Sequence, residues 1–220
     1  MEIQYIGHSC FKITGKRGTV VLDPYQEYVG FALPNLSADI VTSSHDHPDH
    51  NEVTGVKGTA RREKPFVITQ PGEYEIGGIS VFGIESYHDA VQGAERGSNT
   101  IFTVFIDDVL VCHLGDLGQE LTSEQLEAIG TVDVVFCPVG GHFTLNPSQA
   151  VKTIQQLEPS YVIPMHYNTS QHDQQVFADV LPLEKFLHEY GKTPVPQAKV
   201  KVEKSTLPEE TELVVLVPAA

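Results

Sequence analysis

The chain has 220 residues, 40% of them hydrophobic and 20% charged, which is typical of globular proteins and excludes the composition of disordered chains. Its 14 basic and 29 acidic residues give a formal net charge of −15, so nucleic acid is an unfavourable partner because its phosphates would be repelled. No segment approaches the roughly 20 apolar residues that span a bilayer, and the N-terminus lacks a signal-peptide pattern. We therefore expect a cytoplasmic protein with no membrane partner, folded as one domain over residues 1–220.

Short apolar runs separated by Gly, Pro, Asn or Asp fill the first half of the chain, and this pattern predicts β-strands. The predicted strands cover residues 3–6, 11–13, 19–22, 39–42, 66–69, 79–84, 101–106 and 109–112. The three cysteines, Cys10, Cys112 and Cys137, are widely spaced and lie in or beside apolar runs. This placement favours buried free thiols over a disulfide or a ligand role.

Helices enter the pattern after residue 121, where apolar side chains fall at helical spacing up to Ile129. A strand over residues 132–136 and a helix over 147–157 follow. Asn146 is placed to cap that helix, Pro147 occupies its first position, and Gln149 can complete a capping box. Further strands are predicted at 160–163, near 200 and at 213–217, with a helix over 183–189, so the sheet is completed by late strands.

The segment His45-Asp46-His47-Pro48-Asp49-His50 places three imidazoles and two carboxylates in six positions, directly after the predicted strand 39–42. Loops at strand ends are where scaffolds carry functional groups. Neutral imidazole and carboxylate oxygen together suit zinc, manganese or iron. The alternative, a solvated turn, would crowd ionisable groups without a counter-charge, so the segment predicts a metal site.

This segment resembles the His-x-His-x-Asp-His signature of the metallo-β-lactamase superfamily. The resemblance continues along the chain, because superfamily members add a His, an Asp and a His after later strands, and His88, Asp116 and His166 stand in those places. The resemblance implies an α/β (α+β) fold, the four-layer αββα sandwich. It also implies that one metal ion is held by His45, His47 and His88, a second by Asp49, His50 and His166, with Asp116 bridging them.

Weaker matches connect the chain to a small bacterial and archaeal branch of that superfamily, the predicted Zn-dependent hydrolases, which is also related to an ascorbate-lactone hydrolase. They are His8, Asp23, the 71–75 segment and the loop Gly140-Gly141-His142. With Asp49, the residues His8, Asp23 and His142 are the catalytic candidates. The alternative for Asp23 is a turn-starting residue before Pro24, and His142 could protonate a leaving group or be a surface residue. His113 is too close to a strand core to be a candidate, and we expect His172 and His188 to be exposed.

The resemblance implies a hydrolase that holds two divalent ions, zinc first with manganese or iron as alternatives, and uses a metal-bridging water or hydroxide as nucleophile. The bond would be ester-like, a lactone or phosphodiester in a small-molecule substrate. Asp116 stands where antibiotic-hydrolysing members carry Cys, and the 50 positions from Asp116 to His166 leave no room for the large insertion of RNA-processing members. Two alternatives stay open: a non-catalytic metal-binding or regulatory module, and a di-iron redox protein, although redox members pair with a flavin domain that is absent here. A homo-oligomer is compatible with the sequence.

Overall fold

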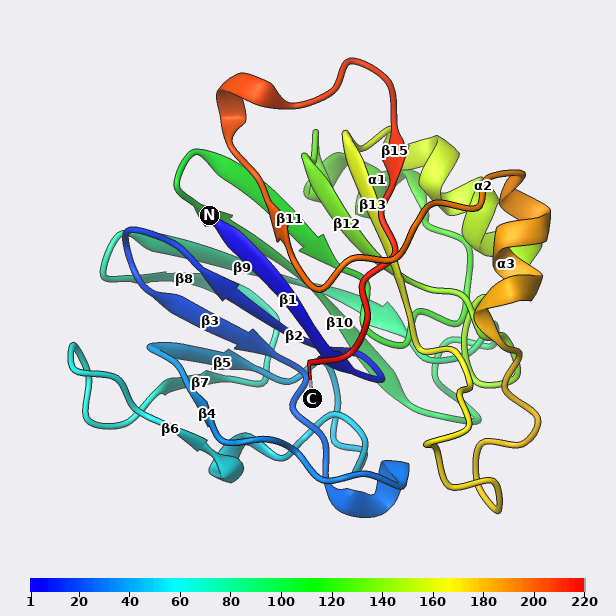
Figure 1. Ribbon diagram of the computed structural model, residues 1–220, viewed down its shortest axis with the longest axis horizontal. Coiled ribbons are helices and arrows are strands. Elements are labelled where there is room, and N and C mark those ends of the chain that lie inside the picture. Colours follow the sequence, from blue (N-terminus) through cyan, green and yellow to red (C-terminus); the bar gives the residue numbers. More distant parts are fainter. Residues whose placement is uncertain (220) are drawn as a thin grey trace.

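Two mixed β-sheets packed face to face form the body of the molecule in a computed structural model that describes residues 1–219 (Figure 1). The first sheet has the order β14-β1-β2-β3-β5-β7, and its strands are β1 (Glu2–Gly7), β2 (Cys10–Thr14), β3 (Thr19–Leu22), β5 (Ile40–Thr42), β7 (Phe66–Ile68) and β14 (Val200–Lys201). The second has the order β15-β13-β12-β11-β10-β9-β8, and its strands are β8 (Gly72–Ile76), β9 (Ile79–Tyr87), β10 (Ser98–Ile106), β11 (Val109–His113), β12 (Val134–Pro138), β13 (Tyr161–Met165) and β15 (Glu212–Leu213).

Alternation of apolar side chains along the strands explains the packing of the sheets. In β2 and β3, Phe11 and Leu22 point into the main core between the sheets, whereas Cys10 and Val21 point to the outer face of the first sheet. The rings of Phe11 and Phe136 stack across the interface with centroids 3.8 Å apart. Burial of both faces leaves little freedom of register, because a slip of one residue would exchange the two sets.

Three α-helices cover the outer side of the second sheet: α1 (Ser123–Ile129) contacts β9, α2 (Pro147–Leu157) contacts β12, and α3 (Leu183–Tyr190) packs on α2. The outer face of the first sheet is covered differently. A second apolar cluster, which includes Val29, Leu36, Val56 and Phe177, packs there. Its elements are short: the 3-10 helices η1 (Glu27–Val29) and η2 (Val53–Gly55) and the paired strands β4 (Leu36–Ser37) and β6 (Val56–Lys57), while a third 3-10 helix, η3 (Lys204–Thr206), lies near the C-terminus.

Most predicted elements are confirmed, with shifts at their ends. The helix over 147–157 has its predicted bounds, and Asn146 and Gln149 form the reciprocal capping box. The three cysteines are buried and free. The prediction missed β8, and the late strand predicted at 213–217 is wrong in length because only Glu212–Leu213 pairs with β13. None of the described helices is long and apolar enough to cross a membrane.

Strand directions bring the functional loops to one edge of the sandwich. Strands β1, β3 and β5 run in the same direction, as do β9, β11 and β13 in the other sheet. Each is followed within three residues by a predicted site residue: His8, Asp23, His45, His88, Asp116 and His166. The carboxyl ends of parallel strands meet at one sheet edge, so residues up to 158 positions apart in sequence, 166 minus 8, converge.

Candidate metal centre

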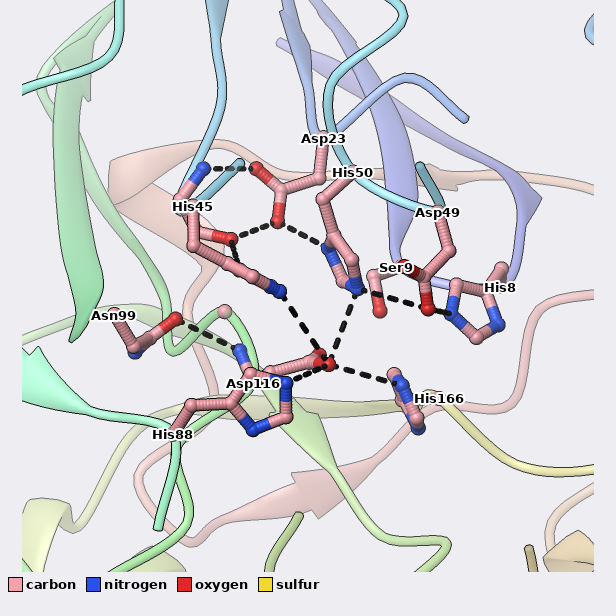
Figure 2. Close-up of polar contacts among 12 residues, drawn as sticks. His8, Ser9, Asp23, His45, Asp49, His50, His88, Asn99, Asp116 and His166 are labelled. Carbon is pink, nitrogen blue, oxygen red and sulfur yellow. Dashed lines mark hydrogen bonds and ion pairs between the residues drawn. The ribbon is translucent and has the colours of Figure 1, made fainter. Parts of the chain in front are cut away.

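The residues that the sequence predicts as metal ligands converge at this edge, and Figure 2 shows most of them around the carboxylate of Asp116. One group of possible ligand atoms comes from His45, His47 and His88. A second comes from His8, Asp49, His50 and His166, and Asp116 groups with His45 and His50; within each group the atoms lie within 4.8 Å of one another. All seven predicted ligands therefore lie in one cluster, with His8 beside them.

Asp116 is the centre of the cluster. Its Oδ2 atom lies 3.2 Å from Nε2 of His50, 3.2 Å from Nε2 of His88 and 3.1 Å from Nε2 of His166. The side chain is 1% exposed. Its backbone is also fixed, since the Asp116 N–H donates to Oδ1 of Asn99 at 2.9 Å. One carboxylate thus faces imidazoles from both groups.

These close approaches do not satisfy the atoms that make them. Among the described residues, Nε2 of His45, His50 and His166 and Oδ1 of Asp116 are buried without a hydrogen-bond partner. Buried polar atoms are nearly always paired, and a cluster of unpaired lone pairs is an arrangement that a bound cation would satisfy. The separations also suit one, because two ligands about 2.0–2.1 Å from a tetrahedral zinc ion lie roughly 3.3 Å apart. The donor set fits a divalent metal.

The charge states of the cluster also fit a divalent metal. Burial lowers the pKa of His8 to about 4 and holds the pKa of His45 well below its usual value. Burial opposes ionisation of Asp116, but His166 and His50 outweigh it and keep the pKa of this carboxyl well below its usual value. Neutral imidazole and ionised carboxylate are the forms that bind metal. His50 and His88 differ. Burial opposes their protonation, but the surrounding carboxylates, Asp116 foremost, together outweigh it and raise both pKa values, so metal ions here would displace protons.

Asp23 orients one of the candidate ligands, His50. Its buried carboxylate accepts hydrogen bonds from the Ser44 N–H at 2.8 Å, the Ser44 hydroxyl at 2.5 Å and Nδ1 of His50 at 2.8 Å. A carboxylate can only accept, so His50 donates from Nδ1. A metal ion that displaces the Nε2 proton would then meet the lone pair of that nitrogen beside Asp116. Burial opposes ionisation of Asp23, but His113 and His50 hold its pKa below the usual value. This is the carboxylate–histidine arrangement that supports metal ligands.

His8 and His172 form a second orienting chain, and the prediction that His172 is exposed is wrong. Nδ1 of His172 accepts the Thr169 N–H at 3.1 Å, so its proton is on Nε2, which lies 3.2 Å from Nδ1 of His8. His8 then accepts at Nδ1 and donates from Nε2 to Oδ2 of Asp49, 3.2 Å away. Both nitrogens of His8 are engaged, so His8 orients Asp49. His172 is only 5% exposed because its loop folds back over Phe177.

The other histidines separate clearly from the cluster. His113 is buried, accepts the Gly115 N–H at 3.0 Å and donates from Nε2 to the Ser9 carbonyl at 2.8 Å, so it links the two sheets. His188 is exposed, as expected. His142 is also exposed, with its ring centroid 4.3 Å from that of Phe143. Within residues 1–219 no hydrogen bond joins His142 to the cluster, so its role as an acid stays a prediction.

Backbone conformation shows how tightly the edge is built. His8, Asp23 and His166 have φ values of 54°, 45° and 51°, in a region that non-glycine residues rarely adopt. Such strain persists where the surrounding structure over-determines it, commonly at functional sites. Gly115 has φ of 57°, and a Cβ atom there would lie 2.2 Å from Oδ1 of Asn99, the atom that anchors Asp116.

Two pockets border the cluster. One of about 360 Å³ opens onto His47, Asp49, His88 and Asp116, and its walls are Tyr28, Pro48, Glu95, Arg96, Phe143, Val176 and Phe177. The other, about 490 Å³, is lined mostly by polar side chains and meets the cluster only at His45. The first pocket is the more closely connected to the cluster, because more of the candidate ligands line it. Apart from Pro48, these walls lie outside the motifs and could not be predicted from sequence pattern.

Comparisons with known proteins agree with this geometry. A family model described as a beta-lactamase superfamily domain matches residues 2–166. A UPF0173 metal-dependent hydrolase from Staphylothermus marinus is 30% identical over 191 residues, 76% of this chain and 83% of that protein, and one from Thermococcus onnurineus is 29% identical over 192 residues, 77% and 85%.

Solved structures show the same relationship. A Thermotoga maritima protein assigned to the Zn-dependent hydrolases of the metallo-beta-lactamase superfamily shares 32% identity, covers 98% of both chains and superimposes with a TM-score of 0.76. An isothiocyanate hydrolase from Delia radicum gut bacteria, at 15% identity, 92% and 99% coverage and a TM-score of 0.63, shares the fold. The chain therefore belongs to the beta-lactamase superfamily and is one of its metal-dependent hydrolases.

Proposed function

We propose that this hydrolase uses two divalent cations, zinc first, to cleave an ester-like bond, a lactone or a phosphodiester, in a small-molecule substrate. The observation that carries the proposal is the position of Asp116, whose single Oδ2 atom faces His88 on one side and His50 and His166 on the other. A carboxylate between two sets of imidazoles can serve both as a shared ligand. A one-metal site would not need it there.

The ligands divide by element. His45 and His47 follow β5 and His88 follows β9, and these three form one set. Asp49 and His50 lie further along the same loop as His45, and with His166 after β13 they form the other set. Asp23 and His8 stay outside both sets, because each already hydrogen-bonds a ligand. Asp49 is thus a candidate ligand whose orientation is set by the hydrogen bonds that run from His172 through His8.

Two bound divalent ions would supply a nucleophile from water near neutral pH and polarise the oxygen of the scissile group. The cysteines of the chain do not supply an alternative nucleophile. Burial raises the pKa of the Cys112 and Cys137 thiols, so neither offers a thiolate. The pocket of about 360 Å³ is at the small end of the range for small-molecule sites. A compact substrate, rather than a polymer, fits this volume.

Elemental analysis and activity together test the proposal. We expect about two zinc or manganese ions per chain in wild type and fewer in His47→Ala and Asp116→Ala, with His188→Ala as an exposed control that keeps the wild-type content. A panel of lactones, phosphodiesters and thioesters should show turnover by wild type and His188→Ala. Both cluster variants should lose it. Wild-type metal content and turnover in Asp116→Ala would overturn the proposal.

A further inference from the structure

One cation faces the pocket that opens onto the metal centre. Among the residues that line this pocket, Arg96 is the only lysine or arginine. Its guanidinium carbon lies 5.6 Å from the ring centroid of Phe143, close enough for cation–π attraction, and its side chain is 34% exposed. The chain as a whole carries a net charge of −15. The positive charge of Arg96 at this position is therefore opposite in sign to the net charge of the chain.

The loop that carries Arg96 is fixed by a neighbouring carboxylate. Oδ1 of Asp89 accepts the N–H groups of Val91 and Gly93 at 2.9 and 2.8 Å, and Oδ2 accepts those of Glu95 and Arg96 at 3.0 and 2.8 Å. Asp89 directly follows His88, so the loop begins at the metal centre. These four bonds hold the backbone of Arg96 at the rim of the pocket.

The guanidinium has spare hydrogen-bonding capacity. In the described part of the chain, its one ion pair is with Glu95, at a long 3.9 Å. Glu95 is 68% exposed, so the pair is screened by solvent and contributes little. A guanidinium presents five donors in a planar fork that matches a carboxylate or phosphate. Most of these donors are available to a bound molecule.

The remaining wall is aromatic. The ring of Phe177 lies 6.0 Å from that of Tyr28 and 6.4 Å from that of Phe143, so rings from η1 and two loops form one apolar wall, in which Phe177 is buried behind the more exposed Tyr28 and Phe143. Tyr28 is 46% exposed although it is a large ring. Such a surface gains free energy when an apolar group covers it.

We infer that the substrate carries an anionic group, a carboxylate or phosphate separate from the scissile bond, which Arg96 binds while the apolar part of the substrate packs against Tyr28, Phe143 and Phe177. The inference rests on the proposed hydrolytic function of the same site. Arg96 is a specificity residue in this account, because it lies at the rim and the cluster around Asp116 does not depend on it. Glu95 is not the recognition group, since its greater exposure leaves it directed to solvent.

Equilibrium binding to the metal-loaded protein tests the inference without turnover. The probes are phenylbutyrate and phenylbutanol, which differ only in the charged end. Arg96→Met keeps a long apolar side chain over Phe143 and removes the charge, Arg96→Lys keeps the charge and loses the fork, and Glu95→Gln is the matched control. We expect Arg96→Met to weaken phenylbutyrate about tenfold or more and phenylbutanol less than about twofold. Arg96→Lys should lie between, and Glu95→Gln should bind at least as well as wild type.

Two outcomes overturn the inference: phenylbutyrate binding that is unchanged in Arg96→Met, or equal losses for both probes. Hydrolysis separates it from the proposed function. Para-nitrophenyl octanoate and the mono-para-nitrophenyl ester of octanedioic acid form a second matched pair, and the charged ester should have the lower KM in wild type but not in Arg96→Met. Turnover of the panel with no charge preference and unchanged binding would refute the role of Arg96 alone. Arg96-dependent binding without turnover of any ester would refute the hydrolase proposal alone.

Discussion

Replacing Asp23 by asparagine tests whether the metal centre depends on a single proton position. The amide has the shape of the carboxylate, and its oxygen can still accept the Ser44 N–H that now bonds Oδ1. Its nitrogen then faces Nδ1 of His50, where Oδ2 stands in wild type. Two N–H donors cannot share a hydrogen bond, so His50 must move its proton to Nε2. That nitrogen faces Asp116 and would lose its lone pair for the metal.

The expected magnitude follows from partners of this kind. Removing the hydrogen-bond partner of a metal-bound histidine typically weakens metal affinity 10–100-fold, which is about 1.4–2.7 kcal/mol. Stability should also fall in the metal-free protein. Asp23 is fully buried and accepts three hydrogen bonds, and losing an acceptor at such a site costs about 1–3 kcal/mol.

Asp39→Asn is the matched control, because Asp39 is also a buried carboxylate of the first sheet but lies before β5, at the end opposite to the metal loop. It accepts the Thr19 N–H at 2.8 Å and the Thr59 hydroxyl. Chelator competition gives the zinc affinity, and nitrogen NMR of the imidazoles reports which nitrogen of His50 is protonated. We expect Asp39→Asn to lower the melting temperature and leave zinc affinity within about twofold of wild type. Wild-type zinc affinity in Asp23→Asn, with His50 protonated on Nε2, would refute the reasoning.

Three further predictions concern neighbouring features. His172→Leu removes the donor to Nδ1 of His8, so imidazole NMR should show a mixture of His8 tautomers and chelator competition a zinc affinity reduced up to about tenfold; a single unchanged tautomer would contradict the chain of hydrogen bonds. Gly115→Ala should lower both zinc affinity and melting temperature, whereas Gly191→Ala, also at positive φ but in open space, should lower only the melting temperature. Asn146→Ala removes the cap of α2 and should cost about 1 kcal/mol, roughly 2–4 °C in thermal unfolding, with metal content unchanged.

The candidate metal ligands converge in one cluster, and the sequence could single them out because each carries a local signal. His45 to His50 form a dense motif, and His88, Asp116 and His166 each stand shortly after an apolar strand. Strand direction then brings residues that are distant in sequence together, because the carboxyl ends of parallel strands lie at the same edge of the sandwich. The tight spacing of the motif and the short gaps after the strands leave few ways to arrange the ligands.

The orienting chain could not be predicted in the same way. His172 lies in a polar segment without periodicity, which is typical of an exposed loop. It is buried because the loop is held from outside its own sequence: the Asp173 N–H donates to the Val29 carbonyl at 2.9 Å, and the ring contacts Phe31 and Phe177. Contacts between loops depend on the whole fold, so the local sequence pattern does not predict them.

Strand β8 was missed for a different reason. Its sequence Gly-Glu-Tyr-Glu-Ile is polar, and both Glu73 and Glu75 are exposed. It forms an edge of the second sheet and pairs only with β9, through the Gly77-Gly78 turn. Charged residues on an edge strand discourage pairing with other chains. The same residues, Glu73 and Glu75, interrupt the apolar pattern by which a strand is predicted from sequence.

Phe177 packs between the pocket wall and the histidines that orient Asp49. Its ring faces Tyr28 and Phe143 on the substrate side and lies 5.1 and 5.4 Å from the rings of His8 and His172 on the other. A change of shape at Phe177 therefore alters the packing of the histidines that orient Asp49. Arg96 and Tyr28 have no such contact with the orienting chain among the described residues. Changes at Arg96 and Tyr28 should thus leave the candidate metal centre little altered, whereas a change at Phe177 should affect the pocket wall and the orienting histidines together.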